Sequence, residues 1–203
     1  MYKFELPTKD LNKINNVLTD PGGIIAFPTD TVWGLGCIIN NKQAVDRIYS
    51  IKERPKNKPL ILLGSKIDDL VPYIDKINIT ATKIIEKYLP GAVTVILPKS
   101  KLTPDYITSG FDTVGIRIPA HVPFIELLNK CVDGHILATT SANISGNKTS
   151  ICRNDVESDL GNYVDYILDD YGYFSLELES TVVFIANDGK IKILRQGAVN
   201  IDI

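Results

Sequence analysis

The chain has 203 residues, a length that fits one domain with a substantial hydrophobic core. Hydrophobic residues make up 44% and charged residues 23% of the sequence, which excludes disordered and fibrous proteins. There are 22 basic and 24 acidic side chains, so the net charge is −2. The protein as a whole therefore has no basic field for nucleic acid, although a local basic patch is compatible with this balance.

Three cysteines, Cys37, Cys131 and Cys152, are widely spaced, and no Cys-x-x-Cys pair occurs. This pattern favours reduced thiols over a disulfide framework or a zinc ribbon. The first residues carry charges and a proline, unlike a signal peptide. The apolar runs are far shorter than the roughly 18 residues of a membrane span. We therefore expect a cytoplasmic protein that does not contact membranes.

The first half of the chain alternates amphipathic helices with short apolar strands. Apolar residues recur at helical spacing over four segments, 8–20, 41–52, 67–74 and 79–89. Continuous apolar runs, typical of buried strands, occupy 23–27, 59–64 and 92–97. Loops are expected between them: a polar, glycine-bearing loop at 28–36, a basic loop at 53–59 and an irregular stretch at 100–112.

The second half continues with the same kinds of element. The expected strands are 113–118, 136–140, 164–168, 181–186 and 190–194, and the last two form a hairpin across Asn187–Gly189. Helices are expected at 123–132 and 155–160, with a loop over 147–154. Since no repeat or linker is visible, the sequence predicts one α/β or α+β domain, residues 1–203, built around a mixed sheet.

Several common signatures are absent from the sequence. Gly34 and Gly36 do not begin a dinucleotide fingerprint, because Ile39 stands where the third glycine would be. There is no Walker A sequence and no Gly-x-Ser-x-Gly elbow. His121 and His135 are too far apart for a helical metal pair. Any nucleotide site must therefore be of a less common type.

A row of basic residues is the first positive signal. Lys52, Arg54, Lys56 and Lys58 recur at every second position. In an extended chain all four would lie on one side, where they could clamp a polyphosphate. A solvated surface loop explains the same row, and the row by itself slightly favours that interpretation.

Two polar segments follow apolar strands, the position where α/β proteins commonly bind ligands. Pro28–Gly36 offers the hydroxyls of Thr29 and Thr31, and Trp33 could form one wall of a small pocket. Thr139–Gly146 combines hydroxyl and amide groups, which suit a small polar ligand or phosphate oxygens. Ordinary capped turns would use the same residue types.

Arg117 lies within an otherwise apolar strand. A guanidinium in such surroundings must either form a structural ion pair or bind an anion. Ser180 and Thr181 stand at the start of a later strand and complete the set of polar candidates.

Taken together and in this order, the motifs resemble those of the YrdC-like family of L-threonylcarbamoyladenylate synthases. The resemblance extends over nearly the whole chain and is carried by six segments: Pro28–Gly36, Lys52–Leu60, Asp112–Pro119, Ser141–Gly146, Ser180–Val183 and Arg195–Gly197. It implies the short form of the family, without the extra C-terminal domain of longer members.

The resemblance also implies a fold and a reaction. The expected fold is a twisted mixed sheet flanked by helices, with a concave basic cavity. The expected reaction joins L-threonine, bicarbonate and ATP to give threonylcarbamoyl-AMP and pyrophosphate. Downstream threonylcarbamoyl-transfer proteins would then pass the group to N6 of adenosine 37 in tRNAs that read codons beginning with A. Mg²⁺ would be held mainly by the ATP phosphates.

The resemblance assigns roles to individual residues. Lys52 and Arg54 are the expected catalytic cations, and no residue is expected to bind a metal directly. The positions matching those that hold L-threonine are Thr31, Arg117, Ser141 and Ser180. The positions matching those near ATP are Lys52, Arg54, Lys58, Thr113, Asn143 and Arg195.

Two other functions would use similar residues. A basic cavity could bind tRNA or double-stranded RNA without chemistry, in which case affinity would fall steeply with salt. The chain could also be a carbamoyl-transfer domain of a maturation system, although such domains usually lie in much longer chains. The basic loop and the serine–alanine–asparagine motif favour the synthase over both.

Overall fold

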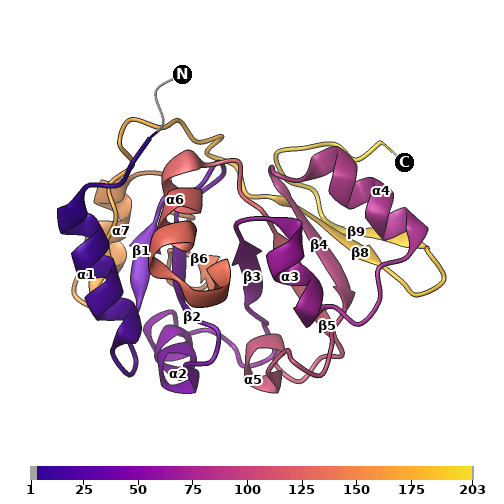
Figure 1. Ribbon diagram of the computed structural model, residues 1–203, viewed down its shortest axis with the longest axis horizontal. Helices are drawn as coiled ribbons and strands as arrows, with labels where there is room; N and C mark the ends of the chain where they lie inside the picture. Colours follow the sequence, from indigo (N-terminus) through magenta and orange to yellow (C-terminus); the bar gives the residue numbers. More distant parts are fainter. Residues whose placement is uncertain (1–3, 203) are drawn as a thin grey trace.

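The apolar segments of the chain pair into one mixed sheet, which the computed structural model describes over residues 4–202 (Figure 1). The strand order within these residues is β7-β1-β2-β6-β3-β5-β4-β8-β9. The strands are β1 (Ile25–Phe27), β2 (Gly34–Ile38), β3 (Ile61–Gly64), β4 (Val93–Pro98), β5 (Thr113–Arg117), β6 (Ile136–Ser141), β7 (Tyr166–Ile167), β8 (Thr181–Ile185) and β9 (Ile191–Arg195).

Helices cover the sheet where their apolar faces can be buried. They are α1 (Thr8–Thr19), α2 (Lys42–Ile51), α3 (Ile67–Leu70), α4 (Ile79–Tyr88), α5 (Asp105–Thr108), α6 (Val122–Cys131) and α7 (Arg153–Leu160), with 3-10 turns at Val71–Tyr73 and Asp133–His135. Asn41 and Asn78 cap α2 and α4, since each side chain accepts a hydrogen bond from a first-turn backbone N–H.

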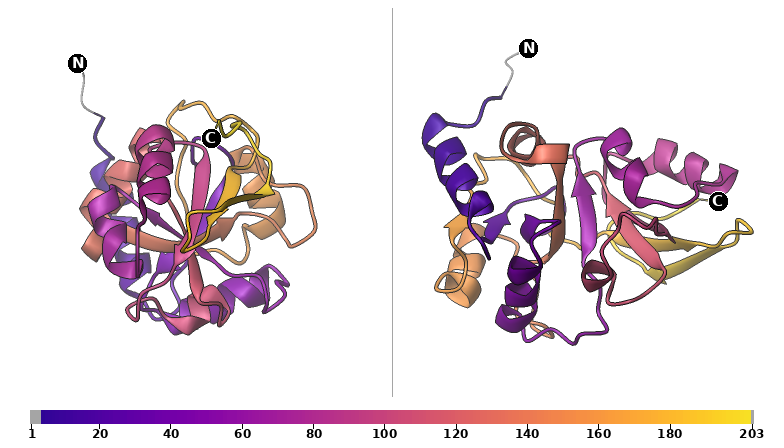
Figure 2. Two further views of the ribbon diagram at one scale, coloured as in Figure 1. Left: turned by 90° about the vertical axis from the view of Figure 1, so that its right-hand side faces the viewer. Right: turned by 60° about the horizontal axis from the view of Figure 1, so that its bottom comes forward.

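The two faces of the sheet bury different helices. Leu62 and Leu63 are neighbours in β3, yet they belong to separate apolar clusters because successive strand side chains point to opposite faces. The Leu62 cluster includes residues of α2, α4, α5 and α7, whereas the Leu63 cluster includes residues of α1 and α6. The strands turn progressively from β1 to β9, so the sheet is strongly twisted (Figure 2). The predicted twisted mixed sheet with flanking helices is thus confirmed.

The register of the central strands places side chains in rows across the sheet. Leu63 of β3 lies opposite Arg117 of β5, and one row further along the strands Ile61 lies opposite Gly115. On the other side of β5, Ile96 of β4 pairs with Gly115, which brings Thr94 level with Arg117. Residues two apart share a face, so these rows form a continuous surface.

One strand in the first half was not predicted. Residues 28–36 were expected to be a loop, but β2 begins at Gly34 and pairs antiparallel with both β1 and β6. The glycines that suggested a loop have a packing role instead: a Cβ on Gly34 would lie 2.5 Å from Cε2 of Phe27. Helix α5 was likewise missed within the polar stretch 100–112.

The three cysteines are all free thiols in the structure. Cys37 is buried, Cys131 is partly buried and Cys152 is exposed. Burial raises the pKa of Cys37 to about 12. No helix within residues 4–202 is long and apolar enough to span a membrane.

His121 caps α6 in an unusual way, because its Nδ1 accepts the backbone N–H of Phe124 at 3.3 Å. The side chain is buried, and its Nε2 has no hydrogen-bond partner among the described residues. Burial lowers the pKa of His121 to about 4, against the weaker opposing effect of Asp30 and Asp170. The folded protein therefore resists a proton that the unfolded chain accepts near pH 6.5.

This difference predicts a loss of stability in acid. As the pH falls from about 6.5 to about 4, His121 becomes protonated in the unfolded state but stays neutral in the folded state. This difference should lower the free energy of unfolding by about 2–3 kcal/mol. The variant His121→Asn retains a capping side chain but does not titrate, so urea unfolding at pH 7 and pH 4.5 should show a smaller loss. His135→Asn is the matched control. Equal acid sensitivity of wild type and His121→Asn would contradict this account.

Candidate functional site

A cavity of about 350 Å³ opens on the sheet surface formed by the rows described above. Its floor is made by alternating residues of adjacent strands: Ile61, Leu63, Thr94, Ile96, Arg117, Thr139, Ser141 and Val182. The loop before β2 supplies a second wall through Thr29, Thr31 and Trp33. The chain between α2 and β3 supplies Arg54 and Lys58, and the chain around β8 and β9 supplies Glu179, Ser180 and Arg195.

Arg117 occupies the inner part of this surface and is fixed by three hydrogen bonds. Its Nε donates to the carbonyl oxygen of Gly91 at 2.9 Å, and Nη1 donates to Oγ1 of Thr31 at 2.8 Å. Nη2 forms an ion pair with Oδ1 of Asp30 at 2.5 Å. Thr31 is itself held by the hydroxyl of Thr29 at 3.0 Å. Of the two alternatives left open by the sequence, the structure therefore shows the ion pair.

Arg54 and Lys58 line the opposite part of the cavity. Arg54 donates from Nε to the carbonyl oxygen of Lys58 at 2.9 Å and from Nη2 to that of Pro59 at 2.8 Å. Tyr49 supports the same turn, since its hydroxyl donates to the Lys58 carbonyl oxygen at 2.8 Å. The guanidinium is thus held in place while part of it remains accessible.

Arg195 and Glu179 form a third group at the cavity wall. Nη1 of Arg195 pairs with Oε2 of Glu179 at 2.6 Å, and Nη2 donates to the carbonyl oxygen of Ser180 at 2.9 Å. The Ser180 hydroxyl lies 2.8 Å from the hydroxyl of Thr94. These contacts place a cation, a carboxylate and two hydroxyls within one small region.

Lys52 lies beneath the cavity. Its side chain is 1% exposed, and Nζ donates to the backbone carbonyl oxygens of Ser141 (2.5 Å) and Asn143 and to Asn143 Oδ1 (3.2 Å). The Asn143 side chain also accepts the Ser141 hydroxyl at 2.6 Å and donates to the carbonyl oxygen of Asn147 at 2.8 Å. Lys52 therefore fixes the loop that follows β6 and so orients Ser141.

Seven of the ten residues predicted for the site line the cavity: Thr31, Arg54, Lys58, Arg117, Ser141, Ser180 and Arg195. Lys52 and Asn143 lie just behind it. Thr113 is at the other end of β5 from Arg117, opposite Pro98. It shares the face of Arg117 but lies two rows beyond it, outside the cavity. The roles assigned to these residues remain predictions, because no ligand contact tests them.

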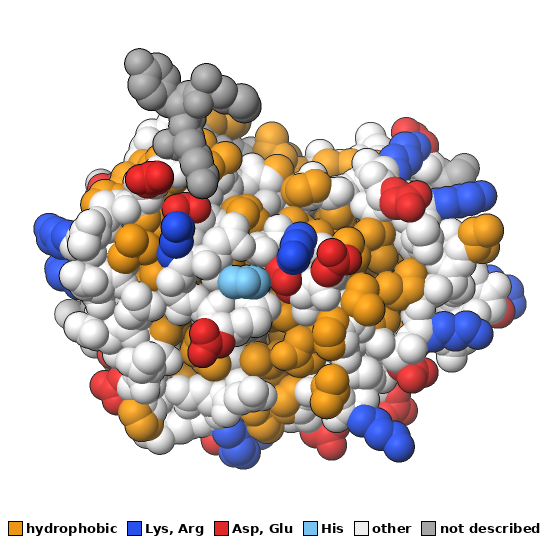
Figure 3. Space-filling view, viewed as in Figure 1, with side chains coloured by type: hydrophobic (Ala, Val, Ile, Leu, Met, Phe, Trp, Pro, Cys, Tyr) orange, Lys and Arg blue, Asp and Glu red, His pale blue; other side chains and the backbone are white. Residues whose placement is uncertain are grey.

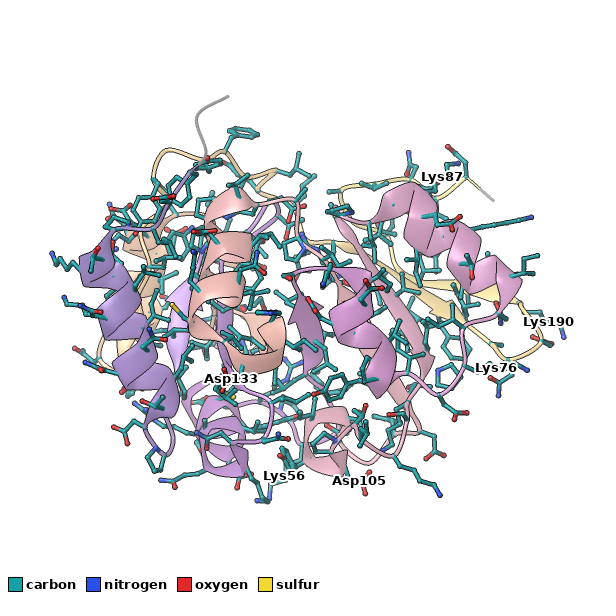
Figure 4. The ribbon with its side chains drawn as sticks, viewed as in Figure 1. Lys56, Lys76, Lys87, Asp105, Asp133 and Lys190 are labelled. Atoms are coloured by element: carbon teal, nitrogen blue, oxygen red, sulfur yellow. The ribbon has the colours of Figure 1, made fainter. Side chains whose placement is uncertain are left out.

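The predicted alignment of four basic residues is wrong. The chain from Lys52 to Lys58 is not extended, because Lys52 follows the last residue of α2 in helical conformation and Lys58 N bonds back to the carbonyl oxygen of Pro55. Lys56 does not line this cavity; together with Arg54 and Asp105 it lines a second one, and Figure 4 shows it at the bottom of the molecule. A turn, unlike a strand, does not place alternate residues on one side.

The net positive charge of the cavity is smaller than its number of basic lining residues suggests. Four cations line it, but Arg117 pairs with Asp30 and Arg195 pairs with Glu179. Lys58 and Arg54 form no ion pair within residues 4–202. The positive excess therefore comes from the side of the α2–β3 turn, and a strongly basic cavity stays a prediction.

Two acidic residues of the site were missed. Asp30 stands between Thr29 and Thr31, which were named as candidate ligand-binding residues, and Glu179 directly precedes Ser180. A buried arginine requires a compensating charge, so the prediction of Arg117 inside a strand was the signal that could have prompted a search for Asp30. Which carboxylate would meet which arginine depends on strand order, which the sequence does not show.

The buried position of Lys52 changes the expected effect of mutating it. As an exposed loop residue it should tolerate substitution, whereas the structure predicts that Lys52→Met lowers the free energy of unfolding by about 2–4 kcal/mol. The reason is that three buried oxygen acceptors lose their donor. Arg54→Ala, in the same segment but partly exposed, should cost about 1 kcal/mol or less. Chemical denaturation of both variants tests this, and equal losses would contradict it.

The fold and the cavity define an α/β protein with a polar cavity on one face of its mixed sheet. Residues 17–197 match the family model for Sua5, YciO and YrdC proteins, described as "Telomere recombination". The chain belongs to the Sua5/YciO/YrdC family. This confirms the family that the motifs indicated.

Individual relatives support the same assignment. A threonylcarbamoyl-AMP synthase of Idiomarina loihiensis is 39% identical over 150 residues, which cover 73% of this chain and 80% of the relative. The solved structure of Pyrococcus abyssi Sua5 complexed with L-threonine has a TM-score of 0.86 at 31% identity, covering 96% of this chain and 56% of that one. Escherichia coli YciO gives a TM-score of 0.82 at 25% identity, covering 97% and 93%. The chain thus spans a little over half of the archaeal Sua5.

Proposed function

We propose that this protein is a threonylcarbamoyl-AMP synthase, which condenses L-threonine, bicarbonate and ATP to L-threonylcarbamoyladenylate and pyrophosphate. One observation carries the proposal. A single cavity combines a fixed guanidinium flanked by hydroxyls with a second set of cations on another wall, as a reaction between an amino acid and a nucleotide requires. The relatives named threonylcarbamoyl-AMP synthase provide independent support.

The inner end of the cavity suits the amino acid. Arg117 can offer a charge-assisted hydrogen bond to the threonine carboxylate, and the hydroxyls of Thr31, Ser141 and Ser180 surround the same space. A site built from such groups holds the amino group at a fixed place, where its nitrogen attacks the carbon of bicarbonate, a C–O bond breaks and water leaves, giving a carbamate. The preset positions of these groups should provide much of the rate enhancement.

The outer cations suit the phosphates of ATP. The carbamate oxygen attacks the α-phosphorus, the bond to the β-phosphate oxygen breaks, and pyrophosphate leaves. Negative charge spreads over the phosphate oxygens during this step, and Arg54, Lys58 and Arg195 are the cavity cations available to stabilise it. Lys52 supports the reaction by positioning the Ser141–Asn143 loop rather than by direct contact.

We propose that Mg²⁺ comes to the site with the ATP phosphates, where it would neutralise their charge. Residues 4–202 contain no cluster of three or more His, Cys, Asp or Glu side chains suited to hold a metal. Glu179 is a carboxylate of the cavity wall that could contact such an ion. This donor set fits a metal bound mainly by phosphate oxygens and water.

The product would be used by downstream threonylcarbamoyl-transfer proteins that modify adenosine 37 of tRNA. Direct binding of tRNA or double-stranded RNA is the alternative use of a basic cavity. Basic and acidic side chains are interspersed over the face shown in Figure 3, which displays no continuous basic area for a nucleic acid. The small, hydroxyl-rich cavity therefore favours the synthase.

The activity has a direct test. Purified protein should release pyrophosphate only when L-threonine, bicarbonate, Mg²⁺ and ATP are all present, because adenylate transfer needs the carbamate as its acceptor. Omitting each component in turn, with pyrophosphate measured enzymatically and the product identified by mass spectrometry, checks this. Release of pyrophosphate at an equal rate without threonine would rule out the proposed function.

The role of the outer cations is tested by comparing two basic residues of one loop. Arg54→Ala should lower kcat/KM for ATP by about 10²-fold, since it removes a cation next to the developing phosphate charge. Lys56→Ala is the matched control, because Lys56, unlike Arg54, does not line the proposed active-site cavity and should retain near-normal kinetics. If both variants behave alike, the α2–β3 turn has no catalytic role.

A further inference from the structure

The inner end of the cavity contains an ion pair whose two members are placed differently. Arg117 lines the cavity, whereas Asp30 is not among the lining residues. Both side chains are nearly buried, with 6% and 11% of their surfaces exposed, and Asp30 Oδ1 lies 2.5 Å from Arg117 Nη2. The guanidinium therefore lines the cavity, whereas the carboxylate contacts it from outside the lining.

The guanidinium still has donors to offer a ligand. Of its five N–H groups, three are engaged by Gly91, Thr31 and Asp30. One N–H remains on each of Nη1 and Nη2. These groups are available to donate to carboxylate oxygens of a ligand, although Asp30 already compensates the charge of Arg117.

Charge compensation changes which ligands the site prefers. An unpaired buried arginine would attract any anion and would repel the ammonium group of an amino acid. The Arg117–Asp30 pair has no net charge, so its longer-range field is that of a dipole. A ligand with both a carboxylate and an ammonium group then keeps its hydrogen bonds to Arg117 without meeting an uncompensated positive charge at that residue.

We propose that Asp30 is a specificity-determining residue: by compensating Arg117 from outside the lining, it makes the inner end of the cavity select an amino acid zwitterion over a carboxylic acid that lacks the amino group. The inference rests on the proposed function, because it takes the ligand of this end to be L-threonine. Its experiment measures binding without ATP, so it does not depend on turnover.

The suitable pair of probes is L-threonine and 3-hydroxybutyrate, which is threonine without its amino group. The wild-type protein should bind threonine at least about tenfold more tightly. Asp30→Asn keeps an oxygen acceptor for Arg117 but removes the negative charge, so the ratio of the two dissociation constants should shift by about tenfold or more toward 3-hydroxybutyrate. Isothermal titration calorimetry with each ligand gives this ratio directly.

A second variant should shift the same ratio in the opposite direction. Arg117→Gln removes the positive member, and the uncompensated Asp30 should then repel 3-hydroxybutyrate more than it repels the zwitterion. Asp165→Asn is the matched control. Asp165 pairs with Arg47 at the same distance of 2.5 Å but outside this cavity, so the ratio should stay unchanged.

The outcomes separate the two hypotheses. Equal wild-type affinities for the two ligands would overturn the inference, and so would an unchanged ratio in Asp30→Asn. If that variant does not fold, as judged by thermal unfolding, the wild-type ratio and Arg117→Gln decide. Wild-type protein that binds neither ligand would contradict the proposed function itself, whereas threonine binding with an unaltered ratio contradicts the specificity role of Asp30 alone.

Discussion

The buried contact between Arg117 and Asp30 joins the parts of the structure on which the site depends. Arg117 ends β5 in the middle of the sheet, and Asp30 lies in the loop between β1 and β2. The same guanidinium also binds the carbonyl oxygen of Gly91, just before β4. An unpaired charge at this depth would be strongly unfavourable, so the three segments must assemble together. The inner wall of the cavity is a consequence of this requirement.

Lys52 has a comparable effect on the part of the cavity that Ser141 lines. Its ammonium group links the end of α2 to the loop after β6, and that loop presents Ser141 to the cavity. Burial and the nearby Arg54 lower the pKa of Lys52 to about 7, which shows how strongly this position disfavours an isolated charge. Three oxygen acceptors around Nζ offset that cost. A residue that resembles a phosphate ligand by sequence is thus held by oxygen acceptors of the chain itself.

The two networks explain how one cavity can serve two different substrates. At the inner end, charge is compensated, so recognition depends on the direction of hydrogen bonds. On the α2–β3 side, Arg54 and Lys58 form no ion pair among the described residues, so a polyphosphate is favoured there. On the proposed function, the ATP phosphates and the amino acid use different groups of the cavity.

The sequence by itself determined most of the local structure and the family. Helical spacing located α1, α2, α4 and α6, and apolar runs located β1, β3 and β4, because these patterns reflect burial on one side of an element. The order of the polar motifs identified the family, and seven of the ten predicted residues line the cavity.

Only the tertiary structure decided which of those residues line the cavity and which contact one another. Strand β2 was hidden because Gly34 makes room for Phe27, a contact between two strands that no local pattern reveals. Lys52 was buried against Ser141 and Asn143 instead of lining the cavity with Arg54, and Asp30 was brought to Arg117 from 87 residues away in the chain. Such contacts depend on strand order and register, which arise when the whole sheet assembles. Neighbouring residues in the sequence do not encode them.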